Sequence, residues 1–281
     1  MASRAKQWSA ACRNPACHNY TAFLMTSRAN RLLAFVDVIG FPLFILAFIW
    51  RLQFTARWTW MLLAGWIVAS FLVHRDTPKT IGARGDNLLS ATKRAGIAFA
   101  ILAGGLVAIG LARGAPRHLP AHLISLNRLW TYFAFCLLQQ VALNSLLANR
   151  LEFLTGKRWL ASLVAGVIFA ACHWPNPVLV PLTFIGGTVM AWLFLSERNI
   201  IPLAVMQALL GTVAWWSFPV AWHHHLRVGP GYYLGAIGFR TPLRVWTRRR
   251  VIDLRGKLST MKPKKIRSSV GMVRLSSIDS I

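Results

Sequence analysis

The sequence predicts an all-α, polytopic membrane protein, a transmembrane helical bundle of about seven spans. Of its 281 residues, 56% are hydrophobic and only 14% are charged, with a mean hydropathy of +0.49, whereas a soluble domain carries about 25% charged residues. Seven apolar runs are long enough, or nearly so, to cross a bilayer core, which takes roughly 20 helical residues. Basic residues lie between and after these runs, as in other multi-pass membrane proteins.

The excess of basic residues fits a membrane better than a nucleic acid. The chain has 32 Lys and Arg residues against 7 Asp and Glu, a formal charge of +25. In a soluble protein this balance would indicate nucleic-acid binding. Here the cations flank apolar runs, where positive-inside topology and anionic headgroups explain them. We therefore expect membrane lipids as partners, no nucleic acid, and a multi-pass location in the cell inner membrane.

The expected elements follow from the apolar runs and the polar residues between them. We expect helices near residues 32–50, 58–74, 95–112, 129–148, 159–173, 178–196 and 200–219. The segment from Arg75 to Arg94 carries five charges in its interior and is expected to be a solvated loop. Asp37 lies inside the first run, either as a helix-end residue near the interface or as a paired group inside the bundle.

The fifth run ends in a segment that cannot continue as helix. Two prolines follow His173 closely in His173-Trp-Pro-Asn-Pro177, and proline neither donates a backbone hydrogen bond nor favours helix in the residue before it. His173 is therefore predicted at a helix end beside irregular backbone. Such backbone is tolerated within a membrane where it is buried in protein or lines a wet cavity.

Polar side chains interrupt three of the apolar runs. Gln139, Gln140 and Asn144 lie in the fourth, His173 ends the fifth, and Gln207 lies in the last. Gln140 and Asn144 share one helix face because they are four residues apart. Interhelical hydrogen bonding, worth about 0.6–2 kcal/mol for each group, is one interpretation. The other is a shared polar pocket in the bundle.

The order and spacing of these residues resemble the CPBP family, which comprises type II CAAX prenyl endopeptidases and lysostaphin-resistance-like, or Abi, intramembrane proteases. Gln139-Gln140-x3-Asn144 stands where the family has Glu-Glu-x3-Arg, and Phe169-x3-His173 matches its second motif. Asn199-Ile-Ile-Pro-x4-Gln207 stands where it has a helix that ends in the third-motif histidine. The resemblance covers about residues 125–220.

The resemblance implies peptide-bond hydrolysis within the bundle. The family glutamate activates water, and its histidines, with or without a divalent metal such as zinc, position that water and the oxyanion. The catalytic candidates that the resemblance implies by position are His173, Gln139, Gln140 and Gln207. The candidate metal ligand is His173. Asn144, Asn176 and Asn199 are the substrate-binding candidates.

Four of these positions depart from the family pattern in a mutually consistent way. Glutamine cannot act as a general base near neutral pH, and Gln207 replaces an imidazole that could bind metal or stabilise an oxyanion. Asn144 removes the basic partner, which is no longer needed when the two carboxylates are absent. We therefore expect these substituted positions together to carry no charge.

Two histidine-containing segments lie outside these motifs. Cys12, Cys17 and His18 lack the second ligand pair of a structural zinc site. His223-His224-His225 follows the last run, either as replacement ligands that reach over the pocket or as a polar stretch in an interfacial aromatic belt.

The domain organisation expected is a basic N-terminal arm over residues 1–30, transmembrane helices over 31–124, a CPBP-like core over 125–220 and a basic, disordered tail over 221–281. Two functions stay open: an intramembrane endopeptidase homologue with weak or lost activity, or a non-catalytic pseudoprotease that holds a lipidated or helical client. A small transporter is a weaker alternative because the chain shows no inverted repeat.

Overall fold

A computed structural model describes residues 15–114 and 126–236, and every regular element in these ranges is helical. The longer helices are α2 (Pro15–Ala47), α4 (Trp60–Val73), α6 (Leu88–Ala112), α7 (Leu126–Gln140), α8 (Asn149–Thr155), α9 (Arg158–Ala171), α10 (Leu179–Glu197) and α11 (Ile201–Ser217). The shorter ones are η1 (Phe48–Leu52), α3 (Gln53–Thr55), η2 (Arg57–Thr59), α5 (Pro78–Ile81), η4 (Val141–Ala148), α12 (Val220–His223), η5 (His224–Leu226) and α13 (Pro230–Ala236).

Four helical segments in the described part of the chain are long and apolar enough to cross a membrane: Arg28–Thr55, Leu88–Ala112, Leu129–Thr155 and Leu179–Glu197. Three shorter apolar helices accompany them: Arg57–Val73, Arg158–Ala171 and Ile201–Ser217. Large apolar side chains stay exposed along these helices, as expected where lipid rather than water surrounds the protein. The prediction of an all-α membrane bundle is confirmed.

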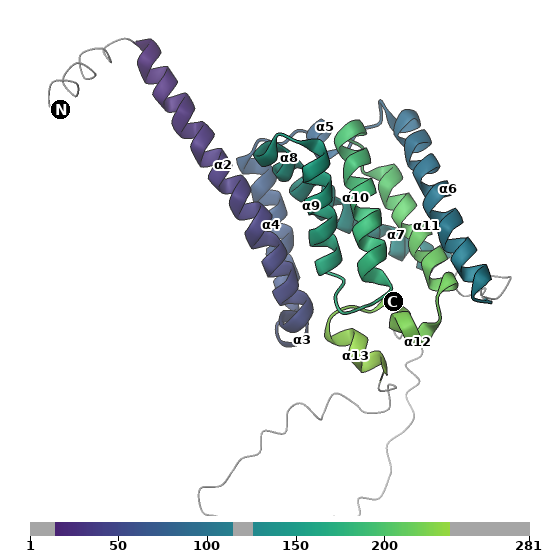
Figure 1. Cartoon of the computed structure of the whole chain (residues 1–281). Coiled ribbons are helices and arrows are strands. Elements are labelled where there is room, and N and C mark those ends of the chain that lie inside the picture. The colour runs from purple at the N-terminus through teal and green to yellow at the C-terminus, as the bar shows by residue number, and fades with distance from the viewer. Residues whose placement is uncertain (1–14, 115–125, 237–281) are drawn as a thin grey trace, which may run out of the picture. The chain divides into compact units, whose positions relative to one another are not determined.

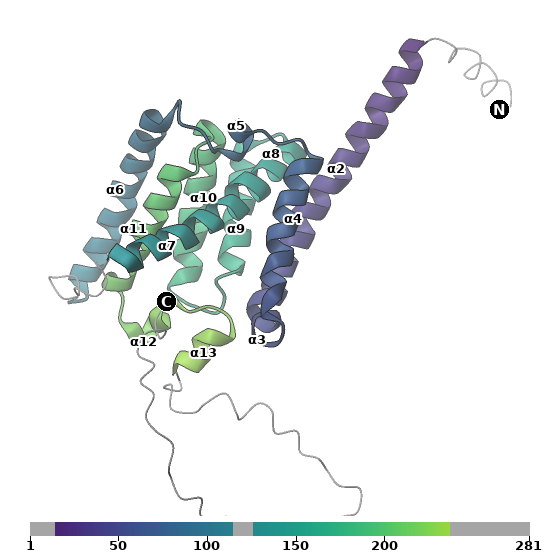
Figure 2. The ribbon, with the colours of Figure 1, turned by 180° about the vertical axis from the view of Figure 1, so that it is seen from behind.

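The helices α9, α10, α11 and α6 lie side by side, with α2 and α4 next to α9 at one end of the row (Figure 1). From behind, α7 runs obliquely across the bundle (Figure 2), and it packs against α11. The main apolar core lies between α9, α10, α11, α6 and the η4–α8 segment. This arrangement places the middle of the α7–η4–α8 segment at the centre of the bundle.

Helices α9 and α10 approach each other closely at Gly166. A Cβ atom built on Gly166 would overlap the Thr188 Oγ1 atom and would lie 2.8 Å from the Phe184 carbonyl oxygen. Only glycine fits at such a close approach, and small residues serve the same purpose in other membrane helix pairs.

Two features of the helices differ from those expected. Helix α2 begins at Pro15, so the boundary at residue 30 falls inside a helix. Helix η4 is a π-helix rather than a continuation of α7, and residues 143–151 are all buried along it. Such wider turns are frequent at functional sites.

The start of the expected tail is ordered by hydrogen bonds. Residues 221–236 form α12, η5 and α13, and the Gly229 amide donates to the Trp174 carbonyl over 2.9 Å. The Asn176 side chain donates to the carbonyls of His223 and Arg227. The remainder of the predicted tail, from residue 237, lies outside the described residues, as does the arm before residue 15.

The connection between α4 and α6 is largely exposed, as expected for Arg75–Arg94, but α6 already begins at Leu88 and hydrogen bonds hold the connection against the bundle. The Ser145 hydroxyl donates to the Ile81 carbonyl over 2.5 Å, and the Asn149 amide donates to the Thr80 carbonyl over 2.9 Å. The Ile200 amide donates to the Gly82 carbonyl over 3.1 Å. These partners come from distant helices, so a local sequence pattern does not reveal them.

Candidate functional site

Four amide side chains from α7, η4 and α11 meet inside the bundle and form the amide cluster: Gln139, Gln140, Asn144 and Gln207. The Gln140 Nε2 atom donates to the Gln207 Oε1 atom over 2.6 Å. Gln207 in turn donates to Gln139, and Asn144 donates to Gln140. Gln140 and Asn144 are fully buried. The family positions of the first and third motifs are therefore in direct contact.

Three hydrogen bonds link the members of the amide cluster to one another. Gln140 is its centre, because its amide nitrogen also lies 3.0 Å from the Met190 sulfur atom and its oxygen accepts from Asn144. The Asn144 Oδ1 atom is buried without a hydrogen-bond partner among the described residues. All four groups are neutral at physiological pH, so no charge needs compensation there.

His173 lies after the end of α9, as the following prolines predicted, but it does not hydrogen-bond to the amide cluster. Its Nδ1 atom is 2.6 Å from the Phe169 carbonyl oxygen, and its ring meets the Phe169 ring edge-on at 4.6 Å between centroids. A carbonyl only accepts, so Nδ1 carries the proton and Nε2 is the basic nitrogen. The second-motif histidine is therefore oriented by its own helix.

The residues at the family positions do not fit a zinc site. Zinc in proteins takes Cys, His, Asp or Glu ligands, three at least in catalytic sites, whereas this site offers one imidazole and neutral amides. No group of three such residues able to hold a metal ion occurs in the part of the chain that the structure describes. The donor atoms at these positions therefore give a zinc ion too few ligands.

Asn176 and Asn199, expected at substrate-binding positions, hold segments of the protein in place. Asn176 donates to two carbonyls of the segment after α11, and its oxygen accepts from the amides of Val178 and Leu179. Asn199 donates to the Arg84 carbonyl and to the Asn87 side chain, over 2.9 and 3.0 Å. Both are almost fully buried, and a role in substrate binding stays a prediction.

The histidine run after α11 forms local hydrogen bonds. His223 is fully buried; its Nε2 atom lies 3.1 Å from the Phe218 carbonyl oxygen, and its Nδ1 atom accepts from the Leu226 amide. His224 stacks on Tyr232 at 4.2 Å between ring centroids. These contacts order the turn into α13, and no hydrogen bond between described residues joins them to the amide cluster.

Sequence reasoning missed a second buried polar group, the ionic cluster: Asp37, Ser70, His74, Asp76 and Arg150. The Ser70 hydroxyl donates to the Asp37 carboxylate over 2.6 Å, as does the Trp66 indole over 2.8 Å. Arg150 pairs with Asp76 and lies 3.4 Å from Asp37. Of the two alternatives for Asp37, pairing inside the bundle is therefore correct.

His74 completes the ionic cluster. Its Nε2 atom is 3.4 Å from an Asp37 oxygen, a contact without hydrogen-bond alignment. Burial and then the charge of Arg150 lower the pKa of His74, although Asp37 and Asp76 act in the opposite direction. The lone acid within the first apolar run was the one sequence signal for this cluster, since an intramembrane acid generally has a partner.

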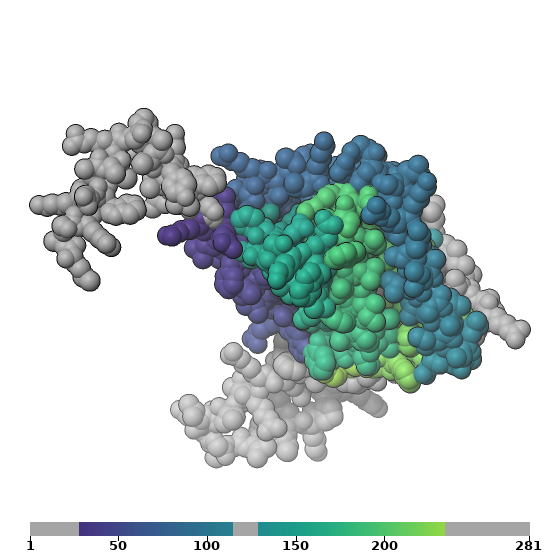
Figure 3. Space-filling view, turned by 45° about the horizontal axis from the view of Figure 1, so that its top comes forward, coloured from purple at the N-terminus to yellow at the C-terminus, as the bar shows by residue number. Residues whose placement is uncertain are grey.

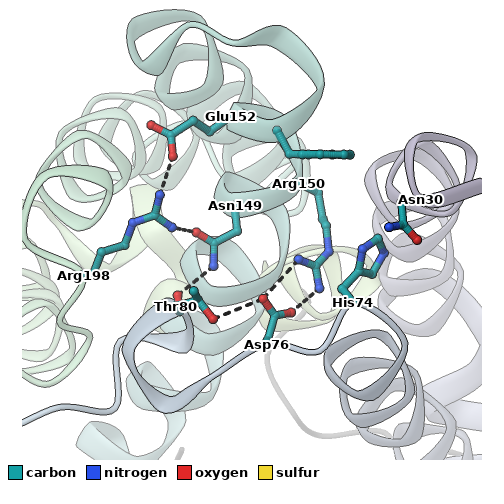
Figure 4. A pocket seen from close by; sticks show the side chains of 9 residues that line it. Asn30, His74, Asp76, Thr80, Asn149, Arg150, Glu152 and Arg198 are labelled. Carbon is teal, nitrogen blue, oxygen red and sulfur yellow. Dashed lines mark hydrogen bonds and ion pairs between the residues drawn. The ribbon is translucent and has the colours of Figure 1, made fainter. Parts of the chain in front are cut away.

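A cavity of about 380 Å³ opens over the ionic cluster (Figure 4). Its lining includes Arg150 and Asp76 on one side and Arg198, which bonds to Glu152 and Asn149, on the other. Both arginines are already paired with carboxylates of the same wall. The cavity is therefore polar but nearly neutral, and it is not lined by the amide cluster or by His173.

The fold and the site together define a helical membrane protein with a cluster of buried amide side chains at its centre. Residues 121–213 match the family model described as type II CAAX prenyl endopeptidase Rce1-like. This match, over about a third of the chain, confirms the CPBP resemblance at the level of the family. No curated protein and no solved structure matches the chain.

Proposed function

We propose that this protein is a membrane-embedded binding protein, a pseudoprotease of the CPBP type that holds a lipid-modified or helical membrane client. CAAX-type intramembrane proteolysis is the activity of the matched family. In this chain, the observation that carries the proposal is the amide cluster, whose members replace both carboxylates, their basic partner and the third-motif histidine.

The chemistry of an amide supports loss of the peptidase step. General acid–base catalysis contributes about 10²–10⁴-fold to rate, and it requires a group that accepts a proton near neutral pH. A glutamine side chain does not, and Gln140 is moreover bonded to Gln207, Asn144 and Met190. Gln139 and Gln207 are only partly buried, and their amides offer both donors and acceptors to a client backbone.

A weak endopeptidase is the second candidate, and His173 is the observation that favours it. Because Nδ1 is held by the Phe169 carbonyl, the free Nε2 atom has the orientation of a general base. His173 is also only partly buried. In this alternative it activates water without a carboxylate partner.

Restoration of the family residues distinguishes the two candidates. The purified chain, the variant Gln139→Glu/Gln140→Glu/Gln207→His and the same variant with Asn144→Arg are reconstituted in liposomes with a farnesylated peptide and its unmodified counterpart. The binder is supported if the natural chain retains the farnesylated peptide uncleaved and only a restored variant cleaves it. Asn144→Arg supplies the cation that two buried carboxylates require.

Cleavage by the natural chain that His173→Ala abolishes supports the endopeptidase instead. If the natural chain neither retains nor cleaves either peptide, both candidates are wrong for this class of client. A chelator is the matched control, because binding through amides does not depend on metal.

We also propose that the chain is a multi-pass protein of the cell inner membrane. The four spanning helices and three shorter apolar helices support this location. Membrane fractionation tests it: the protein should stay with the inner membrane after an alkaline wash, and recovery in the soluble fraction would contradict the proposal.

A further inference from the structure

A groove between α9 and α10 opens on the outer surface of the bundle, away from the amide cluster. It has a volume of about 340 Å³, within the range of sites for small ligands, about 300–1,000 Å³. In the space-filling view, the α9 and α10 surfaces are exposed on the face between α2 and α6 (Figure 3). The groove, called the α9–α10 groove below, is lined by Trp159, Ser162, Leu163, Thr188, Val189, Trp192 and Leu193.

The lining is mostly apolar, and a tryptophan from each helix forms one end. Trp159 and Trp192 are 57% and 46% exposed, and Leu163 is 38% exposed. Tryptophan is enriched where lipid headgroups meet the hydrocarbon. The residues lie in the first two turns of α9 and in the last three turns of α10, so the tryptophan end of the groove lies near the membrane interface.

Cations gather at this end of the groove. Arg158, beside Trp159, donates to the Ser196 hydroxyl over 3.4 Å and so bridges α9 to α10. Its Nε atom is 3.6 Å from a Glu152 oxygen, and the same carboxylate pairs with Arg198. Lys157 is exposed and adjacent in sequence. Arg158 and Arg198 thus share the carboxylate of Glu152, and the adjacent Lys157 adds a further positive charge, which leaves an excess of positive charge.

We propose that the α9–α10 groove is a binding site for an anionic phospholipid. One acyl chain lies in the apolar groove between the two tryptophans, and the phosphate lies against Lys157 and Arg158. Basic sites between membrane helices bind acidic headgroups in this way. A protein helix would fill the apolar part equally well but would leave the excess charge unmatched, which favours the lipid. This site does not depend on the proposed pseudoprotease function.

Native mass spectrometry of the full chain in detergent tests the proposal, with phosphatidylglycerol and phosphatidylcholine of identical acyl chains as probes. The natural chain should retain phosphatidylglycerol in preference to phosphatidylcholine. Arg158→Gln and Lys157→Gln should each weaken this retention about fivefold, because one basic residue near an anionic surface contributes about 1 kcal/mol. Lys93→Gln, an exposed cation at the start of α6, should leave it unchanged.

A pair of variants tests the groove itself. Leu163→Trp fills the groove, whereas Val167→Trp places the same side chain one turn further along α9 at a residue that is 52% exposed and outside the lining. The first should abolish phosphatidylglycerol retention and the second should preserve it. Helicity by circular dichroism confirms that each variant is folded, and Lys157→Gln, at an exposed side chain, keeps the test valid if another variant unfolds.

Three outcomes would overturn the proposal. One is equal retention of the two lipids by the natural chain, and another is an equal loss from Lys93→Gln and Arg158→Gln. The third is a change of oligomeric state in Leu163→Trp with lipid retention intact, which would make the groove a protein interface.

Discussion

The amide cluster and the ionic cluster both draw residues from one continuous helical segment, yet these residues are buried in different ways. Gln140 and Asn144 are neutral, and each meets its neighbours through single hydrogen bonds. Arg150, about two turns further along, is held by Asp76, Ser70 and Asp37 from two other parts of the chain. We therefore expect the amide cluster to tolerate the replacement of one neutral polar side chain by another. The ionic cluster instead depends on matched charges.

The difference follows from the free energy of burial. A neutral amide without a partner costs about 1–3 kcal/mol, whereas removal of one partner from a buried ion pair costs about 3–5 kcal/mol because a charge is left uncompensated. The ionic cluster joins α2, α4 and α8 and is thus expected to stabilise the fold. The amide cluster joins α7, η4 and α11 at the family motifs and is expected to contribute less.

The largest effect is expected from Arg150→Met. It leaves Asp37 and Asp76 buried without their cation, so the free energy of unfolding in detergent should fall by about 3–5 kcal/mol. Denaturant unfolding followed by circular dichroism measures it. The triple variant Arg150→Met/Asp37→Asn/Asp76→Asn, which removes the charges together, should recover part of the loss. A loss from Arg150→Met that is no greater than that from Gln140→Leu would contradict the comparison.

A smaller effect is expected from Gln140→Leu. The substitution leaves Asn144 and Gln207 each without one hydrogen bond, so the free energy of unfolding should fall by about 2 kcal/mol. Gln139→Leu is the control, because Gln139 is only partly buried and accepts one bond from Gln207; it should cost about 1 kcal/mol or less. Equal losses in the two variants would show that Gln140 is not the centre of the cluster.

The smallest effect concerns the pH dependence of stability at His74. Its pKa is lowered in the folded protein by burial and by Arg150, so below pH 6.5 the unfolded chain binds more protons than the folded one. The contribution of His74 to the free energy of unfolding is therefore complete at pH values above its ordinary pKa. It is lost as the pH falls toward the lowered pKa of the folded protein. His74→Gln should make unfolding between pH 7 and 5 less dependent on pH than in the natural chain. Identical pH profiles would exclude this role.

Particular residues show how far the sequence alone carries the prediction. The break after His173 was predictable because proline constrains its immediate neighbours wherever it occurs. The meeting of Gln140 with Gln207, 67 residues apart, was predictable only through the spacing of the family motifs. The hydrogen bond of His173 to the Phe169 carbonyl, rather than to the amide cluster, was not predictable, since it depends on how α9 ends.

Composition and hydrophobic runs by themselves determined that this chain forms a helical membrane bundle, and the motif spacing determined its resemblance to the CPBP family. These are properties of single segments, because a helix in lipid satisfies its backbone internally. The tertiary structure alone decided that Asp37 pairs with Arg150 and that the segment after α4 docks on Ser145 and Asn149. Each of these contacts joins groups more than 60 residues apart, so their partners are set by packing rather than by local sequence.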